Sequence, residues 1–335
     1  MNILVRGRGL AGAWMAWVLR ERGVDVFNYD PSTTDSSSRV AAGLVNPITG
    51  SRPKQTWQSE VVLPVAEAAY RSLERVVGLD LWTPRQIKRI FLTEKDKDLW
   101  HNAVERGLQA PWTAVSEPST DGVPLPFGGV EYQGATVNTN GVIDGVERVL
   151  AHEGRLLSTD PNDADFSHVV WCTGWRAAQD PLWSWLPFQP VKGEILDAEI
   201  DGPPLSSVCI RGIWIVPALA SAPARQSIRI GSTHDWDNLD CTPTEEARAK
   251  LQEKAEALLD RKVVVTGHRA AVRPAARSKR PYLGIHPERS QHLILNGLGA
   301  KGSLWAPWAA HQLADHLLDG KPLTEEISIH RWWTT

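Results

Sequence analysis

The sequence contains little of what characterises secreted, membrane-spanning or nucleic-acid-coating proteins. Its 335 residues include only 3 cysteines, Cys172, Cys209 and Cys241, which suggest neither a disulfide framework nor a zinc site, so no metal is predicted. No apolar run reaches the roughly 18 residues of a spanning helix, and no cleavable leader is recognisable. Basic residues number 36 and acidic residues 39, a net charge of −3 that favours no polyanionic partner. We therefore expect a cytoplasmic protein with no membrane span and no nucleic-acid partner.

The first thirty residues carry the most informative motif. An apolar run at residues 3–5 has the length of a buried strand, and an apolar segment at 11–19 has the length of a helix. Between them Gly7, Gly9 and Gly12 are spaced G-x-G-x-x-G. The first glycine permits a tight turn, the second lets backbone approach a pyrophosphate, and the third lets the helix pack closely on the sheet. Together these features predict a dinucleotide-binding βαβ unit with the phosphates at the helix N-terminus.

Asp30 indicates which dinucleotide is bound. It ends a second predicted strand, residues 24–29, where a carboxylate accepts hydrogen bonds from ribose hydroxyls. An acid at this site disfavours a 2′-phosphate, so NADP is the least favoured dinucleotide. The alternative interpretation of the motif is a glycine-containing turn in some other α/β protein.

The rest of the chain alternates between helical and strand patterns. Because 335 residues exceed one typical core, two lobes are expected. Periodicity predicts helices at residues 58–77, 94–106, 145–152, 244–259 and 304–318. It predicts strands at residues 85–93, 168–174, 190–196, 208–216, 227–232, 262–267 and 293–297. Residues 110–134 are rich in proline and glycine and are expected to be irregular.

Two stretches near the C-terminus are candidate ligand contacts. Arg269 and Arg273 share parity on a predicted strand, so both point to one face, and an arginine held there suits bidentate capture of a carboxylate. The alternative, equally compatible with the spacing, is that residues 269–280 are a solvated basic patch that could touch RNA. Residues 296–302 precede a helix whose positive end would stabilise charge on a reduced flavin. The alternative there is an ordinary loop before a terminal helix.

In order and over nearly its whole length, the chain resembles FAD-dependent oxidoreductases of the D-amino acid oxidase superfamily, in the glycine-oxidase-like branch. The segments that carry this resemblance are the dinucleotide motif at 7–12, the Ser/Thr-x-x-Ala-Ala-Gly segment at 36–44, the strand ending in Thr-Gly at 169–174, the segments at 191–196 and 230–233, the arginine-bearing stretch at 272–284 and the flavin loop at 299–302. Lys192 and Glu194 depart from the Arg and Gln that are more usual in the family.

The resemblance implies an α/β fold with a Rossmann-type FAD-binding lobe and a second substrate lobe of mostly antiparallel β-sheet. We expect the FAD-binding domain in residues 1–80, 135–190 and 265–335, and the substrate domain in residues 81–134 and 191–264. FAD is expected to bind non-covalently, and Arg273 to bind a substrate carboxylate. The implied FAD contacts are Gly7, Gly9, Leu10, Ala11, Gly12, Asp30, Ala41, Ala42, Gly43, Leu44, Thr173, Gly174, Gly299, Ala300, Lys301, Gly302, Ser303 and Leu304.

The activity that the resemblance implies is oxidation of the C–N bond of an amino-acid-like or other amine by hydride transfer to the flavin, with oxygen or a quinone as acceptor. No catalytic histidine is assigned, because this reaction needs no protein acid or base. The same fold acting on a modified tRNA base is one alternative, suggested by residues 269–280. A flavin- or nucleotide-binding sensor or partner protein without turnover is a second, and an NAD-dependent dehydrogenase is a third. No feature of the sequence indicates an oligomeric state.

Overall fold

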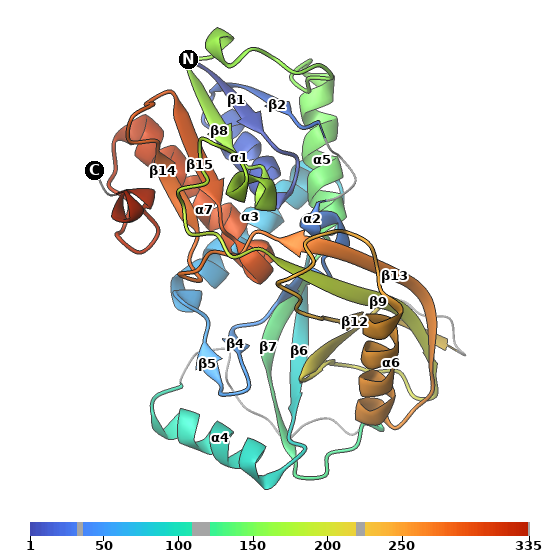
Figure 1. Ribbon diagram of the computed structural model, residues 1–335. Coiled ribbons are helices and arrows are strands. Elements are labelled where there is room, and N and C mark those ends of the chain that lie inside the picture. The colour runs from blue at the N-terminus through green and yellow to red at the C-terminus, as the bar shows by residue number, and fades with distance from the viewer. Residues whose placement is uncertain (32–35, 109–120, 219–224, 334–335) are drawn as a thin grey trace.

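One of the two main sheets is five-stranded and carries the dinucleotide motif (Figure 1). The computed structural model describes residues 1–31, 36–108, 121–218 and 225–333. The strand order is β14 (Tyr282–Ile285), β15 (His292–Asn296), β8 (His168–Trp171), β1 (Asn2–Arg6) and β2 (Asp25–Tyr29). The pairs from β15 to β2 are parallel, and β14 joins the edge antiparallel. The carboxyl ends of four strands therefore meet at one edge of the sheet, where α/β proteins bind ligands.

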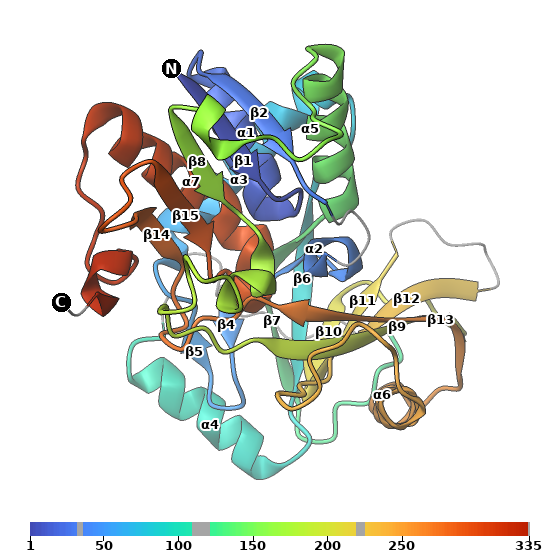
Figure 2. The same cartoon turned by 45° about the horizontal axis from the view of Figure 1, so that its top comes forward.

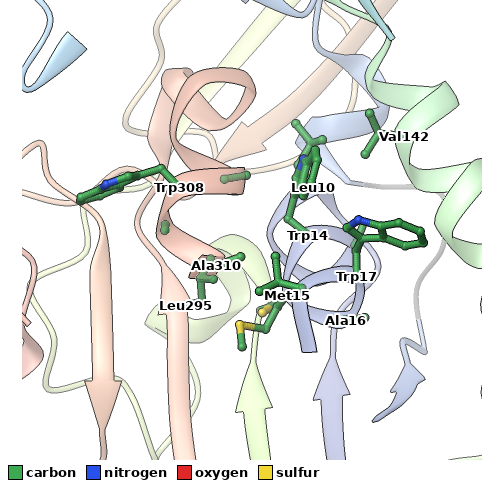
Figure 3. Close-up of a cluster of buried hydrophobic side chains, with 14 of the residues drawn as sticks. Leu10, Trp14, Met15, Ala16, Trp17, Val142, Leu295, Trp308 and Ala310 are labelled. Atoms are coloured by element: carbon green, nitrogen blue, oxygen red, sulfur yellow. The ribbon is translucent and has the colours of Figure 1, made fainter. Parts of the chain in front are cut away.

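Helices α1 (Leu10–Glu21), α3 (Ser59–Val77), α5 (Thr139–His152) and α7 (Gly302–Asp319) pack beside this sheet. Helix α1 is buried on most sides because it lies against α5, α7 and the sheet, which explains its nearly continuous apolar sequence. Figure 3 shows Trp14 and Met15 of α1 in one buried cluster with Leu295 and Ala310. The cluster packs α1 against α7 and against strand β15 of the sheet.

The second main sheet is eight-stranded and mostly antiparallel (Figure 2). Its order is β13 (Val263–Arg273), β9 (Val191–Asp201), β12 (Arg225–Gly231), β11 (Ile213–Pro217), β10 (Val208–Arg211), β6 (Trp82–Ile90), β7 (Gly129–Val137) and β3 (Leu44–Val45). Only the β10–β6 pair is parallel. Helix α6 (Glu245–Leu259) packs on β9 and β13. The predicted α/β class, with parallel and antiparallel sheets, is confirmed.

Shorter elements connect and flank the sheets. They are α2 (Ser37–Val40), the hairpin of β4 (Ile48–Thr49) and β5 (Lys54–Gln55), helix α4 (Glu94–Glu105), and 3-10 turns at Asp163–Asp165, Gly174–Ala178, Gly299–Lys301 and Ile329–Trp332. Within the described ranges, no helix is both long and apolar enough to cross a bilayer.

Several predicted elements are wrong in their extent. The strands predicted at 190–196 and 262–267 continue to Asp201 and Arg273. The helix predicted at 145–152 begins at Thr139, because the side chain of Asn138 accepts a hydrogen bond from the Gly141 amide (2.9 Å) and caps it. The strand predicted at 208–216 is two strands separated by Gly212, whose φ of +70° reverses the chain.

A further correction concerns residues 110–134, for which the sequence predicts an irregular segment. Their final part, from Gly129, belongs to β7, which pairs with β6 throughout. A Cβ on Gly134 would overlap the Ile87 side chain, so this glycine allows close packing rather than a turn. Residues 109–120 lie outside the described residues. Strands β7 and β13 each cross a boundary of the domain division given above, and that division stays a prediction.

Candidate functional site

Three adjoining cavities run from the edge of the five-stranded sheet toward the eight-stranded sheet. The first is bordered by the loops that follow β1, β2 and β8, and it shares Leu10, Ser38, Gly299 and Gly302 with the second. The second and third share Leu44, Trp214, Ser232 and Ala300. Because each cavity shares wall residues with the next, the three together suit one elongated cofactor and a substrate beside it.

The glycine motif shapes the start of the first cavity. A Cβ on Gly12 would overlap the carbonyl oxygen of Gly7, so α1 approaches the β1 loop as closely as only glycine allows. Gly9, at the N-cap of α1, makes no side-chain cap. The Leu10 amide donates instead to Ser38 Oγ (3.0 Å), and the Arg8 amide donates to Asp30 Oδ2 (2.7 Å). This is the arrangement of a pyrophosphate and ribose site.

Two buried polar atoms in residues of the first cavity's wall indicate that a ligand belongs there. Thr173 Oγ1 and Trp175 Nε1 have no hydrogen-bond partner in the part of the chain that the structure describes. A buried polar atom without a partner costs free energy, so a polar ligand would stabilise the site. The donor set and the glycine-lined wall fit a dinucleotide.

The second cavity is lined by small residues and the start of α7. Ala41, Ala42 and Gly43 form one wall. Gly43 has a φ of +71°, and a Cβ there would overlap the Val137 carbonyl oxygen. Gly302 and Ser303 begin the 18-residue helix α7 on another wall, so the positive end of its dipole lies at the cavity. A flat ring system that gains negative charge on reduction fits these walls.

Arg273, the last residue of β13, also lines the second cavity. Its Nη1 and Nη2 atoms donate to the Thr233 carbonyl oxygen at 3.4 and 3.3 Å. Among the described residues no carboxylate lies within ion-pair distance of Arg273, and burial lowers its pKa to about 10. Arg269, by contrast, is paired with Asp197 (2.9 Å). The two arginines that were predicted to point to one face therefore differ in their partners.

The third cavity lies between the β4–β5 hairpin, β10–β11 and the start of α7. Four cationic or titratable side chains line it: Arg89, Arg211, His234 and Lys301. Lys301 Nζ donates to Thr56 Oγ1 (3.0 Å), and burial, with a smaller contribution from Arg280, lowers its pKa to about 8. Burial and the nearby Arg273 lower the pKa of His234. A cavity of this composition attracts anions.

The structure places most of the predicted contacts on these walls. Gly9, Leu10, Ala11, Asp30, Thr173, Gly174, Gly299 and Gly302 border the first cavity. Leu10, Ala41, Ala42, Gly43, Leu44, Arg273, Gly299, Ala300, Gly302 and Ser303 border the second, and Leu44, Ala300, Lys301 and Leu304 the third. Gly7 and Gly12 are not on a wall, and their role is to permit close packing behind it. The contacts of all these residues with FAD stay predictions.

Sequence reasoning missed several wall residues. Ser38, which holds the Leu10 amide, lies in a segment used only for the resemblance. Gly193 lies under Arg273, and Trp214 borders two cavities. Arg89 was predicted only as part of the strand at residues 85–93. No local pattern distinguishes an arginine that lines a cavity from one in solvent. Only the pairing of distant strands brings it to the site.

These features define the class of the protein as an FAD-dependent oxidoreductase. Residues 2–316 match the FAD dependent oxidoreductase (DAO) family, and the chain belongs to this family. The predicted resemblance and FAD as the cofactor of the family are thereby confirmed. Membership makes the chain an FAD-dependent enzyme.

Individual relatives fall into two groups. The tRNA 5-methylaminomethyl-2-thiouridine biosynthesis bifunctional protein MnmC of Caulobacter sp. strain K31 is 28% identical over 339 residues, which cover 95% of this chain and 54% of that protein. Glycine oxidase of Bacillus subtilis is 28% identical over 184 residues, covering 50% of this chain and 45% of that protein. The chain thus spans about half the length of the curated relatives it matches.

Solved structures agree on the fold. Glycine oxidase from Bacillus cereus superposes with a TM-score of 0.77 at 18% identity, covering 96% of this chain and 98% of the other. Iminodiacetate oxidase from Chelativorans sp. gives 0.76 at 20% identity, covering 98% of both chains. At these identities the likeness concerns the fold.

Proposed function

We propose that this enzyme oxidises the C–N bond of an amine that carries a carboxylate, and that Arg273 binds the carboxylate. The observation that carries the proposal is the position of Arg273. It lies on the second cavity, beside the walls expected to hold the flavin, and no described carboxylate neutralises it. An arginine offers a planar pair of donors that matches a carboxylate, and the ion pair would offset the cost of burial.

The residues around the second cavity would orient the substrate rather than transfer protons. Among the described residues on its wall, Arg273 is the one ionisable side chain. FAD, when bound, supplies the two-electron oxidant. Arg273 would hold the carboxylate so that the carbon bearing the nitrogen faces the oxidant, and Ala41, Ala42 and Gly43 would leave room for the ring.

FAD is proposed to bind without a covalent link. Asp30 would accept from the ribose, and the N-terminal ends of α1 and α7 would face the pyrophosphate and the ring. Cys172 lies on the first wall, and burial raises the pKa of its thiol. A protonated, buried thiol is a poor nucleophile, which disfavours attachment there. Oxygen or a quinone is the proposed electron acceptor.

An anaerobic titration tests this function. The FAD-loaded protein is mixed with glycine, N-methylglycine, D- and L-amino acids and iminodiacetate, and the visible flavin bands are followed. The proposal predicts bleaching by at least one amine that carries a carboxylate. Bleaching by none of them, with FAD bound, would contradict it and would favour the sensor without turnover. A protein that purifies colourless and takes up no FAD would favour the NAD-dependent dehydrogenase.

A second candidate substrate is an amine on a modified uridine of tRNA. Two observations favour it. The relatives that match nearly the whole chain are tRNA 5-methylaminomethyl-2-thiouridine biosynthesis proteins, and a further groove lies beyond the β4–β5 hairpin. Exposed Arg52, Lys54 and Arg106 line this groove, and no described acid does. Binding of tRNA that weakens steeply with salt, and weakens further in Arg52→Gln/Lys54→Gln, would support it. Salt-independent or absent binding would exclude it.

A further inference from the structure

The third cavity extends the site beyond the place where Arg273 would hold a carboxylate. Its volume is about 440 Å³, compared with about 120 Å³ for the second cavity. Arg89, Arg211 and Lys301 lie on its wall, and no aspartate or glutamate does among the described residues. The cavity is therefore larger than a small amino acid requires, and it is positively charged.

Arg89 is a cation of this cavity with no ion-pair partner among the described residues. Its Nη2 atom donates to the carbonyl oxygens of Gly50 (2.6 Å) and Ser51 (3.3 Å), and its Cζ lies 6.0 Å from the centre of the Trp100 ring. No carboxylate is within ion-pair distance in the part of the chain that the structure describes. Arg89 is partly buried, and burial lowers its pKa despite the favourable effects of Tyr132 and Asp96. Its charge therefore costs free energy that a bound anion would recover.

Its neighbour Arg211 provides an internal comparison. Arg211 Nε and Nη2 donate to the two carboxylate oxygens of Asp96 at 3.1 and 2.9 Å. Arg211 thus has an ion-pair partner, whereas Arg89 contacts backbone carbonyls of the hairpin and the Trp100 ring and has no carboxylate within ion-pair distance among the described residues. Lys301 likewise has a neutral partner, Thr56 Oγ1. Two cations of the wall, Arg89 and Lys301, are therefore placed to meet an anion from outside the chain.

We propose that the third cavity binds a second anionic group of the substrate, a carboxylate or a phosphate on the substituent of the amine nitrogen, with Arg89 as its main partner. This inference rests on the proposed amine oxidation. The second and third cavities share Leu44, Trp214, Ser232 and Ala300. A substituent attached to the amine nitrogen in the second cavity can therefore extend directly into the third. The substrate class is then an N-substituted amino acid with anions at both ends.

Calorimetric binding to the FAD-loaded protein tests the inference independently of turnover. Three probes differ only at their far end: N-propylglycine, N-(2-carboxyethyl)glycine and N-(2-phosphonoethyl)glycine. Charge-assisted hydrogen bonds predict about tenfold or more tighter binding of at least one anionic probe than of the neutral probe. The tighter of the two anionic probes identifies the anion as a carboxylate or a phosphate.

Arg89→Gln should remove this preference, and Arg89→Lys should retain part of it. Arg225→Gln, the same substitution at an exposed arginine of β12, is the control and should keep the preference in full. Unchanged binding of N-propylglycine by Arg89→Gln shows that the variant is folded. Equal binding of all three probes, no binding of the anionic probes, or an equal loss for all three in Arg89→Gln would overturn the inference. Flavin bleaching, measured separately, decides whether the oxidation itself occurs.

Discussion

Gly193 on β9 lies directly beneath the guanidinium group of Arg273 on β13. A Cβ at position 193 would overlap Nη2 and Cζ of Arg273. The two strands are paired, with Gly193 opposite Ala271, so the contact is set by the sheet register. The absence of a side chain at 193 is therefore what gives Arg273 its place on the second cavity.

Gly193→Ala should weaken the binding of carboxylate-bearing amines. The added methyl group meets the flexible end of Arg273 rather than backbone, so the guanidinium should move while the fold persists. Displacing the guanidinium should weaken a charge-assisted hydrogen bond that contributes about 1.5 kcal/mol. We therefore expect KM for such amines to rise about tenfold. Gly267→Ala on β13, whose Cβ would only touch Asp197 Oδ2 at 3.1 Å, is the control. An unchanged KM in Gly193→Ala would show that Arg273 does not bind the substrate.

Asp30→Ala should lower the affinity for FAD. The carboxylate accepts a hydrogen bond from the Arg8 amide and borders the first cavity. Its loss removes the hydrogen bond that orders the loop after β1 and the proposed acceptor for the ribose hydroxyls. Loss of a hydrogen bond to a charged group predicts a Kd raised about 10- to 100-fold. The quenching of flavin fluorescence on titration of the apoprotein measures this Kd. An unaltered Kd would place the ribose elsewhere.

Thr233→Val should cost stability and disturb the carboxylate site together. Thr233 Oγ1 accepts from the Glu194 amide (2.9 Å), and the Thr233 carbonyl holds Arg273. Valine keeps the shape but leaves that amide without its acceptor, which costs about 1–3 kcal/mol of unfolding free energy. Urea unfolding measures the loss, and a rise in KM should accompany it. A loss of stability with KM unchanged would separate Thr233 from the site.

Lys301 should make the stability of the apoprotein depend on pH above neutrality. Burial lowers its pKa from 10.5 to about 8, so the folded protein releases this proton before the unfolded chain does. Below pH 8 the penalty for the buried charge is fully present, and it is relieved as the pH rises from about 8 to 10.5.

Lys301→Met keeps much of the side-chain shape and removes the charge. Each unit by which burial lowers the pKa of Lys301 corresponds to about 1.4 kcal/mol. At pH 7 we therefore expect Lys301→Met to raise the unfolding free energy of the apoprotein by about 1–3 kcal/mol. The gain should shrink by pH 10. Urea unfolding of both proteins at the two pH values measures it. A gain that does not change with pH would mean that Lys301 keeps an ordinary pKa.

The dinucleotide motif was predictable because its signal is local. The strand at residues 2–6, the glycines and the helix that follows are consecutive, and each has a distinct periodicity or turn requirement. The strand within residues 110–134 was missed for the opposite reason. Gly134 indicates a break locally, and only the Ile87 side chain of the paired strand shows that it serves packing.

The chemistry of the site was only partly predictable. Parity placed Arg269 and Arg273 on one face, but Asp197, 72 residues before Arg269, pairs with Arg269 and leaves Arg273 for a ligand. Arg89 reaches the third cavity through strand pairing that no local pattern encodes. Burial and partner identity depend on the tertiary fold, and they decide which cation is available to a substrate.

The most direct test of the central claim compares matched amines in wild-type protein and Arg273→Gln. N-methylglycine and N-methylethylamine differ in the carboxylate, and their rates of anaerobic flavin bleaching give the contribution of that group. The account predicts that wild type strongly favours the carboxylate-bearing amine and that Arg273→Gln abolishes the difference, with FAD still bound. Equal rates for the two amines in wild type, or the same preference in the variant, would contradict it.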